Sequence, residues 1–135
     1  AAEKYGSQAV VISIDYKNIN GRPIVFTNLG QTNTDKSIFD WLKECEYLGA
    51  GEIFLNSIDR DGKAKGYDTE LVSKIVSSTR LPVIACGGAG SLDDFVDLAK
   101  KTGVSAIAAG NIFHFTELSY PRAKILLKKE GLNFR

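Results

Sequence analysis

Short runs of apolar residues alternate along the chain with segments in which apolar residues recur every three or four positions. The runs predict β-strands, because the strands of a buried parallel sheet are short and continuously apolar. The spaced segments predict amphipathic helices that each bury one apolar side. We place the strands at roughly residues 8–15, 52–58, 82–86 and 105–110. The alternation therefore predicts four strand–helix units built around a parallel sheet.

The helical segments carry signals at their ends as well as an apolar stripe. Ser91 precedes Asp93 and Asp94, and this order is typical of a capping serine followed by an acidic first turn. Proline at the start of the last segment is also typical of a first helical turn. The stripes fall at residues 38–48, 71–76 and 92–99, and a further helix is expected from Ser119 to about Glu130.

The segment between the first strand and the first helix, residues 16–34, is too long for a simple turn. It contains Asn20-Gly21, a strong signal for a two-residue hairpin turn. Residues 24–27, which favour β-structure, follow that turn. We therefore expect a small β-hairpin excursion after the first strand, lying above the parallel sheet.

Length and charge limit the possible classes of protein. The chain has 135 residues, which predicts a single domain over residues 1–135. Its 17 basic and 16 acidic residues give a net charge of +1, which argues against a nucleic-acid or anionic-membrane partner. The apolar runs are too short to span a bilayer. Two cysteines without a disulfide pattern indicate a reducing, cytoplasmic location. The chain opens with alanine, so we expect a fragment of a longer protein.

Polar or glycine residues end every predicted strand. In parallel α/β folds the functional site lies at the carboxyl ends of the strands. We therefore expect these residues to meet at one edge of the sheet. The strand ends are Ser13–Asp15, Asn56–Gly62, Cys86–Ser91 and Gly110–Asn111.

Two of these ends predict a phosphate site. Gly87-Gly88-Ala89-Gly90 leads from a strand into a helix, and Gly110-Asn111 makes the next such turn. Glycines allow a phosphate to approach the backbone, and amides at a helix start bind it. The spacing is not that of a dinucleotide site. The alternative interpretation is that these glycines only form tight turns.

The acidic residues at the strand ends are candidates for acid–base chemistry. Asp15 ends an apolar strand and could act as a general acid or base, or could cap a loop. Asp59 and Asp61 alternate, so one is expected to face the cleft while the other pairs locally with Arg60 or caps the loop. We interpret Cys86 as a small packed residue and His114 as a packed or helix-start residue. The sequence predicts no metal site and no cofactor.

Six motifs occur in order along the chain: Ser13-Ile14-Asp15, Gly51-Glu52-Ile53, Ser57–Gly62, Gly66-Tyr67-Asp68, Cys86–Gly90 and Phe113-His114-Phe115. Together they resemble the C-terminal half of the cyclase subunit of imidazole glycerol phosphate synthase, the HisF family. The resemblance covers nearly the whole chain and implies an α/β fold, the (βα)4 half of a TIM (β/α)8 barrel. A barrel of this kind has roughly 250 residues, about twice this length.

The resemblance also implies an activity. The family uses ammonia from a glutaminase partner to convert a phosphoribulosyl-formimino-carboxamide ribotide into imidazole glycerol phosphate and an aminoimidazole carboxamide ribotide. Asp15 would be one of two acid–base aspartates, the other lying in the N-terminal half. Glu52 would stand at the ammonia entrance on the opposite face. The residues that would bind the phosphorylated substrate are Asn56, Asp61, Gly62, Gly87, Gly88, Gly110 and Asn111.

Three departures from the family pattern leave the substrate open. Asn56 stands where threonine is often found, and Cys86 and Asn111 stand where serine is common. Cys86–Gly90 and Gly110-Asn111 resemble a paralogous branch that makes acetamidino sugars for surface polysaccharides. An aldose–ketose isomerase of histidine synthesis is a further alternative, against which Asp59–Gly62 and Phe113–Phe115 favour the cyclase. As an isolated half, the chain could instead be a non-catalytic phosphate-binding module.

Half a barrel would leave its first and fourth strands as open edges and its inner apolar face exposed. We therefore expect the chain to pair with an N-terminal half-barrel or to associate with itself. The alternative is an open, flavodoxin-like sheet.

Overall fold

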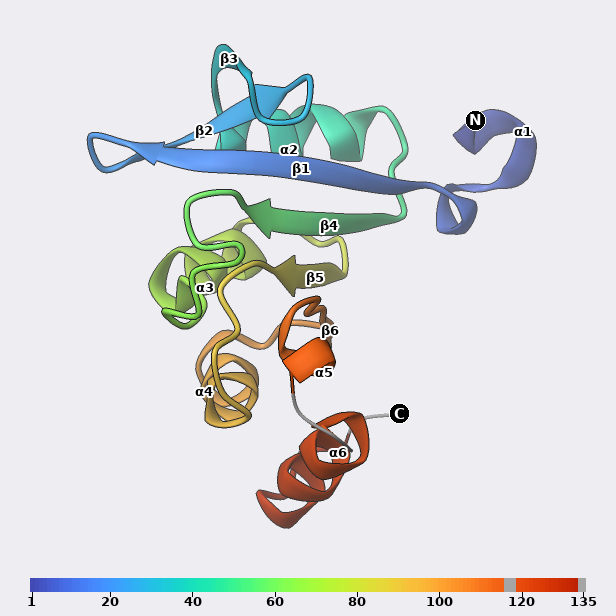
Figure 1. The fold of residues 1–135 in the computed structure, drawn as a ribbon. Helices are drawn as coiled ribbons and strands as arrows, with labels where there is room; N and C mark the ends of the chain where they lie inside the picture. Colours follow the sequence, from blue (N-terminus) through green and yellow to red (C-terminus); the bar gives the residue numbers. More distant parts are fainter. Residues whose placement is uncertain (116–118, 134–135) are drawn as a thin grey trace.

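A six-stranded mixed sheet forms the centre of the computed structural model, which describes residues 1–115 and 119–133 (Figure 1). The strand order is β3-β2-β1-β4-β5-β6. The last four strands in that order are parallel, which confirms the predicted parallel segment. Their bounds are Val11–Ile19 for β1, Glu52–Ser57 for β4, Val83–Cys86 for β5 and Ala106–Ile107 for β6.

The hairpin forms at the predicted turn but not in the predicted place. Asn20 and Gly21 have φ angles of 51° and 80° and connect β1 to β2, Arg22–Thr27, which pairs antiparallel with β1. Strand β3, Thr32–Ser37, follows on the outer side of β2. The hairpin therefore extends the sheet and does not lie above it. The expectation that the first strand is an open edge is wrong for its carboxyl half, because β1 continues to Ile19 and pairs there.

Four helices of ten or eleven residues lie at the predicted stripes. Side-chain caps begin two of them: Ser37 Oγ accepts from the Phe39 amide, and Asp68 Oδ1 accepts from the Leu71 amide. The four helices are α2 (Ile38–Tyr47), α3 (Thr69–Ser78), α4 (Asp93–Thr102) and α6 (Ser119–Lys129). Short turns complete the chain at α1 (Ala2–Tyr5), the 3-10 helix η1 (Ser7–Ala9) and α5 (Ile112–Phe115).

The prediction that Ser91 caps α4 is wrong. Leu92 occupies the cap position and its side chain makes no capping hydrogen bond. Asp94 Oδ2 instead accepts from the amides of Gly90 and Ser91, at 2.9 and 2.8 Å. A carboxylate is a stronger acceptor than a hydroxyl for backbone amides, so Asp94 takes this role from inside the helix.

Among the described residues, the main hydrophobic core lies on one side of the sheet. Alternate strand residues on that side pack against α2, α3 and α4, and include Ile14, Tyr16, Ile53, Leu55, Val83 and Ala85. The opposite face is less covered, and Val11 there is 51% exposed. A flavodoxin-like sheet would carry helices on both faces, so this arrangement is consistent with half of a TIM barrel. No helix in the described ranges is both long and apolar enough to cross a membrane.

Candidate functional site

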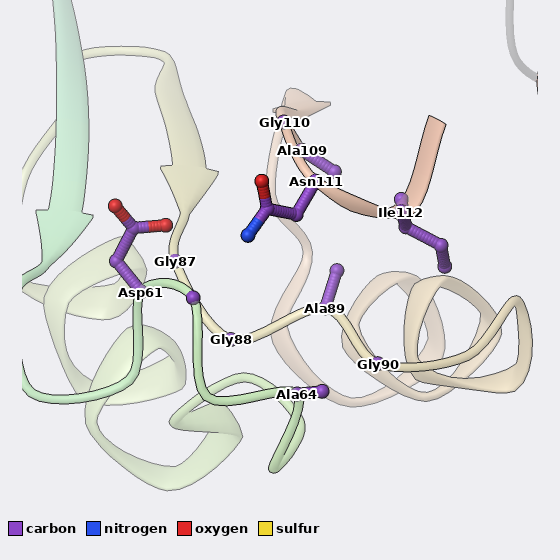
Figure 2. A pocket seen from close by; sticks show the side chains of 11 residues that line it. Asp61, Ala64, Gly87, Gly88, Ala89, Gly90, Ala109, Gly110, Asn111 and Ile112 are labelled. Carbon is purple, nitrogen blue, oxygen red and sulfur yellow. The ribbon is translucent and has the colours of Figure 1, made fainter. Parts of the chain in front are cut away.

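The loops that follow β4, β5 and β6 enclose a pocket of about 180 Å³ (Figure 2). Each loop contributes one wall. The first wall contains Asp61, Gly62 and Ala64, the second is residues 87–90, and the third is residues 109–112. The structure therefore brings together Gly87, Gly88, Gly110 and Asn111, which the sequence predicted at a phosphate site. It also places beside them Asp61 and Gly62, which the resemblance implied as substrate-binding residues.

Polar groups in the pocket are few and mostly uncharged. The lining has one carboxylate, Asp61, and contains neither lysine nor arginine. The Asn111 side chain points from the third wall towards the first, and its Nδ2 lies 3.8 Å from where a Cβ on Gly62 would be (Figure 2). The amides of Gly90 and Ser91 already bind Asp94. A phosphate would therefore have to use other amides and the Asn111 side chain.

Close packing of the walls accounts for the glycines of the second wall. A Cβ on Gly88, whose φ is +116°, would lie 2.3 Å from the Gly66 carbonyl oxygen. A Cβ on Gly87, with φ +92°, would lie 2.7 Å from the Ser57 carbonyl oxygen. These positions need glycine whether or not a phosphate binds. Gly110 differs, because a Cβ there would meet nothing within 4 Å and would enter open space.

Asp15 lies at the carboxyl end of the parallel part of β1 and contacts Asn56 on the neighbouring strand. Asn56 Nδ2 donates a 3.0 Å hydrogen bond to Asp15 Oδ1. The other amide atom, Asn56 Oδ1, is buried and has no hydrogen-bond partner among the described residues. Asn56 therefore contacts the Asp15 carboxylate and is not among the residues that line the pocket. Asp15 makes this side-chain contact rather than a bond to a loop amide, which argues against the capping role.

The alternating aspartates separate as expected, although not through the expected partner. Asp61 lines the pocket, whereas Asp59 Oδ2 accepts a 2.7 Å hydrogen bond from the Asn18 amide in the hairpin. Arg60 does not pair with Asp59; its Nη1 donates to the Gly66 carbonyl at 3.2 Å, and its Nε lies 3.9 Å from Asp68. Asp59 therefore ties the hairpin to the first wall.

Cys86 and His114 have environments unlike those of catalytic groups. Burial raises the pKa of the Cys86 thiol, and the charges of Asp61 and Asp15 raise it further. The thiolate is therefore disfavoured, which fits a small packed residue better than a nucleophile. His114 is exposed in α5 and not packed. No cluster of metal-ligating side chains occurs among the residues that the structure describes.

Glu52 lies at the opposite end of the strands from the pocket. It is the first residue of β4 and pairs in register with Val11 of β1. With a rise of about 3.3 Å per residue, the length of β4 separates it from the pocket by roughly 17 Å. Its half-buried side chain belongs to the sheet face that the helices leave uncovered.

Sequence reasoning missed two contacts that join the walls. The Gly66 amide donates to the Gly88 carbonyl at 2.9 Å, and the Tyr67 hydroxyl donates to the Ala108 carbonyl at 2.8 Å. Gly66-Tyr67 appeared in the sequence only as part of a family motif. A tyrosine within a polar loop offers a weak signal, since a buried tyrosine hydroxyl usually has a hydrogen-bond partner, but the sequence does not identify that partner.

Comparisons with known proteins agree with the resemblance. Residues 1–119 match the family described as "Histidine biosynthesis protein". The chain is 47% identical over 134 residues to "Imidazole glycerol phosphate synthase subunit HisF" of Thermotoga sp. (strain RQ2), covering 99% of this chain and 53% of that protein. It is 46% identical over 135 residues to the protein of the same name from Saccharolobus solfataricus, covering 100% of this chain and 54% of that protein.

A third relative of that name, from Chlorobaculum parvum, is 45% identical over 134 residues, covering 99% of this chain and 53% of that protein. The chain spans about half the length of the curated relatives it matches. The sequence motifs, the one-sided sheet and these matches agree, and the chain belongs to the HisF group of the histidine biosynthesis protein family.

Proposed function

We propose that this chain supplies the C-terminal half-barrel of a HisF-type cyclase. In that reaction ammonia and a phosphoribulosyl-formimino-carboxamide ribotide give imidazole glycerol phosphate and an aminoimidazole carboxamide ribotide. The observation that carries the proposal is a pocket lined by residues from the loops after β4, β5 and β6, at the carboxyl end of the parallel strands. This edge is where (β/α)8 barrels bind phosphorylated substrates.

The pocket suits one phosphate group and a short carbon chain. Its volume of about 180 Å³ is below the roughly 300–1,000 Å³ of typical small-molecule sites. In the proposed complex, amides of Gly88 and Gly110 and the side chain of Asn111 hold the phosphate. Asp61 would repel a dianion, so we assign it to accept a hydrogen bond from a substrate hydroxyl beside the phosphate.

Asp15 is the proposed acid–base residue of this half. Its carboxylate faces the uncovered side of the sheet together with Asn56, its hydrogen-bond partner. A second aspartate would come from an N-terminal half-barrel packed on the same face. We therefore expect the chain alone to bind phosphate but not to turn over substrate.

The proposed partners follow from the Glu52 end of the sheet and from its uncovered face. A glutaminase subunit would dock at the end that carries Glu52, where ammonia would enter. An N-terminal half-barrel, or a second copy of the chain in its absence, would cover the open face. We propose the cytoplasm as the location, in keeping with the two cysteines and the lack of a disulfide pattern in the sequence. We propose neither nucleic acid nor a membrane as a partner, in keeping with the net charge of +1.

The acetamidino-sugar paralog is the second candidate function. The three departures from the family pattern all fall at the site. Asn56 contacts Asp15, Asn111 lines the pocket, and Cys86 pairs in register with Asn56. Changes in these positions would alter substrate contacts while leaving the fold and the use of ammonia intact.

Gly110→Asp tests the phosphate site. The new side chain would enter open space, so the fold should persist while the added charge repels the ligand. We expect inorganic phosphate to shift the backbone amide resonances of Gly88, Gly110 and Asn111 saturably in the wild-type chain. Gly110→Asp should weaken binding at least 10-fold, or about 1.4 kcal/mol, which lies within the roughly 1–4 kcal/mol expected for two unit charges about 4 Å apart.

The matched control is Gln31→Glu, which makes the same change in charge at an exposed residue of the hairpin. It should bind phosphate as the wild type does. Equal weakening in both variants would indicate only a general charge effect, and a wild-type chain without saturable shifts would refute the phosphate site.

A further inference from the structure

The third wall of the pocket has little support from the rest of the sheet. Strand β6, which leads into it, is only two residues long. The Ala108 amide donates a 2.8 Å hydrogen bond to the Ala85 carbonyl. At the turn beyond it, a Cβ added to Gly110 would meet no atom within 4 Å. Ala109 and Ile112 pack partly buried against the hydrophobic core. Among the described residues, the hydrogen bonds that tie this wall to other elements are those made at Ala108.

Tyr67 makes such a contact from the opposite side of the pocket. Its hydroxyl donates to the Ala108 carbonyl at 2.8 Å. Among the described residues, this is the one side-chain hydrogen bond that reaches residues 105–114 from outside that segment. It joins residues 41 positions apart in the sequence, so it links the β4 loop directly to the end of β6.

The Tyr67 ring is held firmly enough to act as a support. The side chain is only 6% exposed, and its ring packs against Phe95 with centroids 6.2 Å apart. Burial raises the pKa of the hydroxyl well above its usual range, so it remains a donor at any physiological pH. The preceding residue, Gly66, donates its amide to the Gly88 carbonyl in the second wall.

Gly66 and Tyr67, in the loop after β4, therefore make hydrogen bonds to Gly88 in the second wall and to Ala108 beside the third wall. We propose that Tyr67 is a positioning residue for phosphate binding, and that its hydroxyl holds the third wall at the distance from Gly88 that one phosphate spans. This inference rests on the proposed phosphate site. Tyr67 acts through Ala108 on the Gly110–Asn111 turn and does not itself line the pocket.

Tyr67→Phe tests the inference, since it removes the hydroxyl and keeps the ring. We expect phosphate to bind about 3- to 10-fold more weakly, as the loss of one neutral hydrogen bond predicts. Hydrogen exchange at the Gly110 and Asn111 amides should accelerate by a similar factor, with exchange in α2 and α3 unchanged. A purely structural role would instead accelerate exchange throughout the core.

The matched control is Tyr16→Phe, which removes the hydroxyl of another buried tyrosine, 2% exposed, on the helix-covered side of the sheet. It should leave phosphate affinity unchanged. Placing 4-aminophenylalanine at position 67 retains a donor and should restore near-wild-type binding. If Tyr67→Phe does not fold, 4-fluorophenylalanine at position 67 fills the hydroxyl volume without donating and should show the same loss.

The possible outcomes separate the two proposals. Saturable phosphate binding in the wild type, with equal affinity in Tyr67→Phe or the fluorinated variant, would overturn the role of Tyr67 and leave the phosphate site standing. An absence of phosphate binding in the wild type would overturn the site and the inference together.

Discussion

Gly88 and Gly21 both have positive φ angles, but their surroundings differ. A Cβ on Gly88 would lie 2.3 Å from the Gly66 carbonyl oxygen, whereas one on Gly21 would meet nothing within 4 Å. Alanine with a positive φ costs about 1–2 kcal/mol, and overpacking adds about 1–3 kcal/mol. Gly88→Ala should therefore lower the free energy of unfolding by about 2–5 kcal/mol, as measured by urea denaturation.

Gly21→Ala is the control for the backbone contribution alone and should cost about 1–2 kcal/mol. Equal losses in the two variants would show that the second wall does not pack tightly on the β4 loop. The difference between them measures how closely the walls of the pocket approach.

The grouping of the pocket residues could be predicted from sequence, but their individual contacts could not. Parallel strands end at one edge of a sheet, so strand-end residues such as Asp61, Gly88 and Asn111 had to lie close together. The bonds from Asn56 to Asp15 and from Tyr67 to Ala108 each join residues 41 positions apart. Such pairs depend on side-chain orientation in the folded chain, which local patterns do not encode.

At the scale of elements, the hairpin and the start of α4 show where local signals were insufficient. Asn20-Gly21 correctly predicted a turn, but strand pairing depends on β1 continuing to Ile19 beyond its apolar run. The Asp59 bond to the Asn18 amide then fixes the hairpin beside the site. Ser91 has a good capping sequence, yet Asp94 takes the available amides. Competition between neighbouring acceptors decided that helix start.

The Glu46 carboxylate connects α2 to the segment after α3, and this connection depends on pH. Glu46, in the last turn of α2, accepts hydrogen bonds from the Thr79 hydroxyl and the Arg80 amide, just after α3. These two bonds hold the pKa of Glu46 below its ordinary value. A lowered pKa in the folded state means that the ionised form stabilises the fold at neutral pH. That contribution is lost as the pH falls through the folded-state pKa.

Glu46→Gln should therefore be less stable than the wild type at pH 7, by under about 1 kcal/mol because the carboxylate is exposed. The difference should shrink as the pH is lowered below the ordinary pKa of a glutamate, which urea denaturation at several pH values would measure. Glu3→Gln, at an exposed residue of α1, should show no such dependence. A constant difference at all pH values would show that the ionised carboxylate contributes nothing specific.

At the scale of the whole molecule, the sheet face that the helices leave uncovered is available to a partner. The chain exposes 8312 Å², whereas a compact monomer of this mass exposes about 6,900 Å². The excess exceeds the roughly 800 Å² that each partner buries in a standard interface. The resemblance to a half-barrel implied this uncovered face, whereas the apolar patterns of the helices and strands also allowed an open, flavodoxin-like sheet. They could not show how far the hairpin would extend the sheet.

A partner on that face should complete the acid–base pair, and catalysis tests this directly. The measurement is ammonia-dependent turnover of the formimino ribotide by the chain mixed with the N-terminal half of the Thermotoga HisF relative. We predict turnover by a one-to-one complex, no turnover by either half alone, and a loss of at least about 100-fold in Asp15→Asn, as expected for a removed acid–base group. A well-folded complex that binds the ribotide but does not turn it over, or turnover unchanged in Asp15→Asn, would contradict the account.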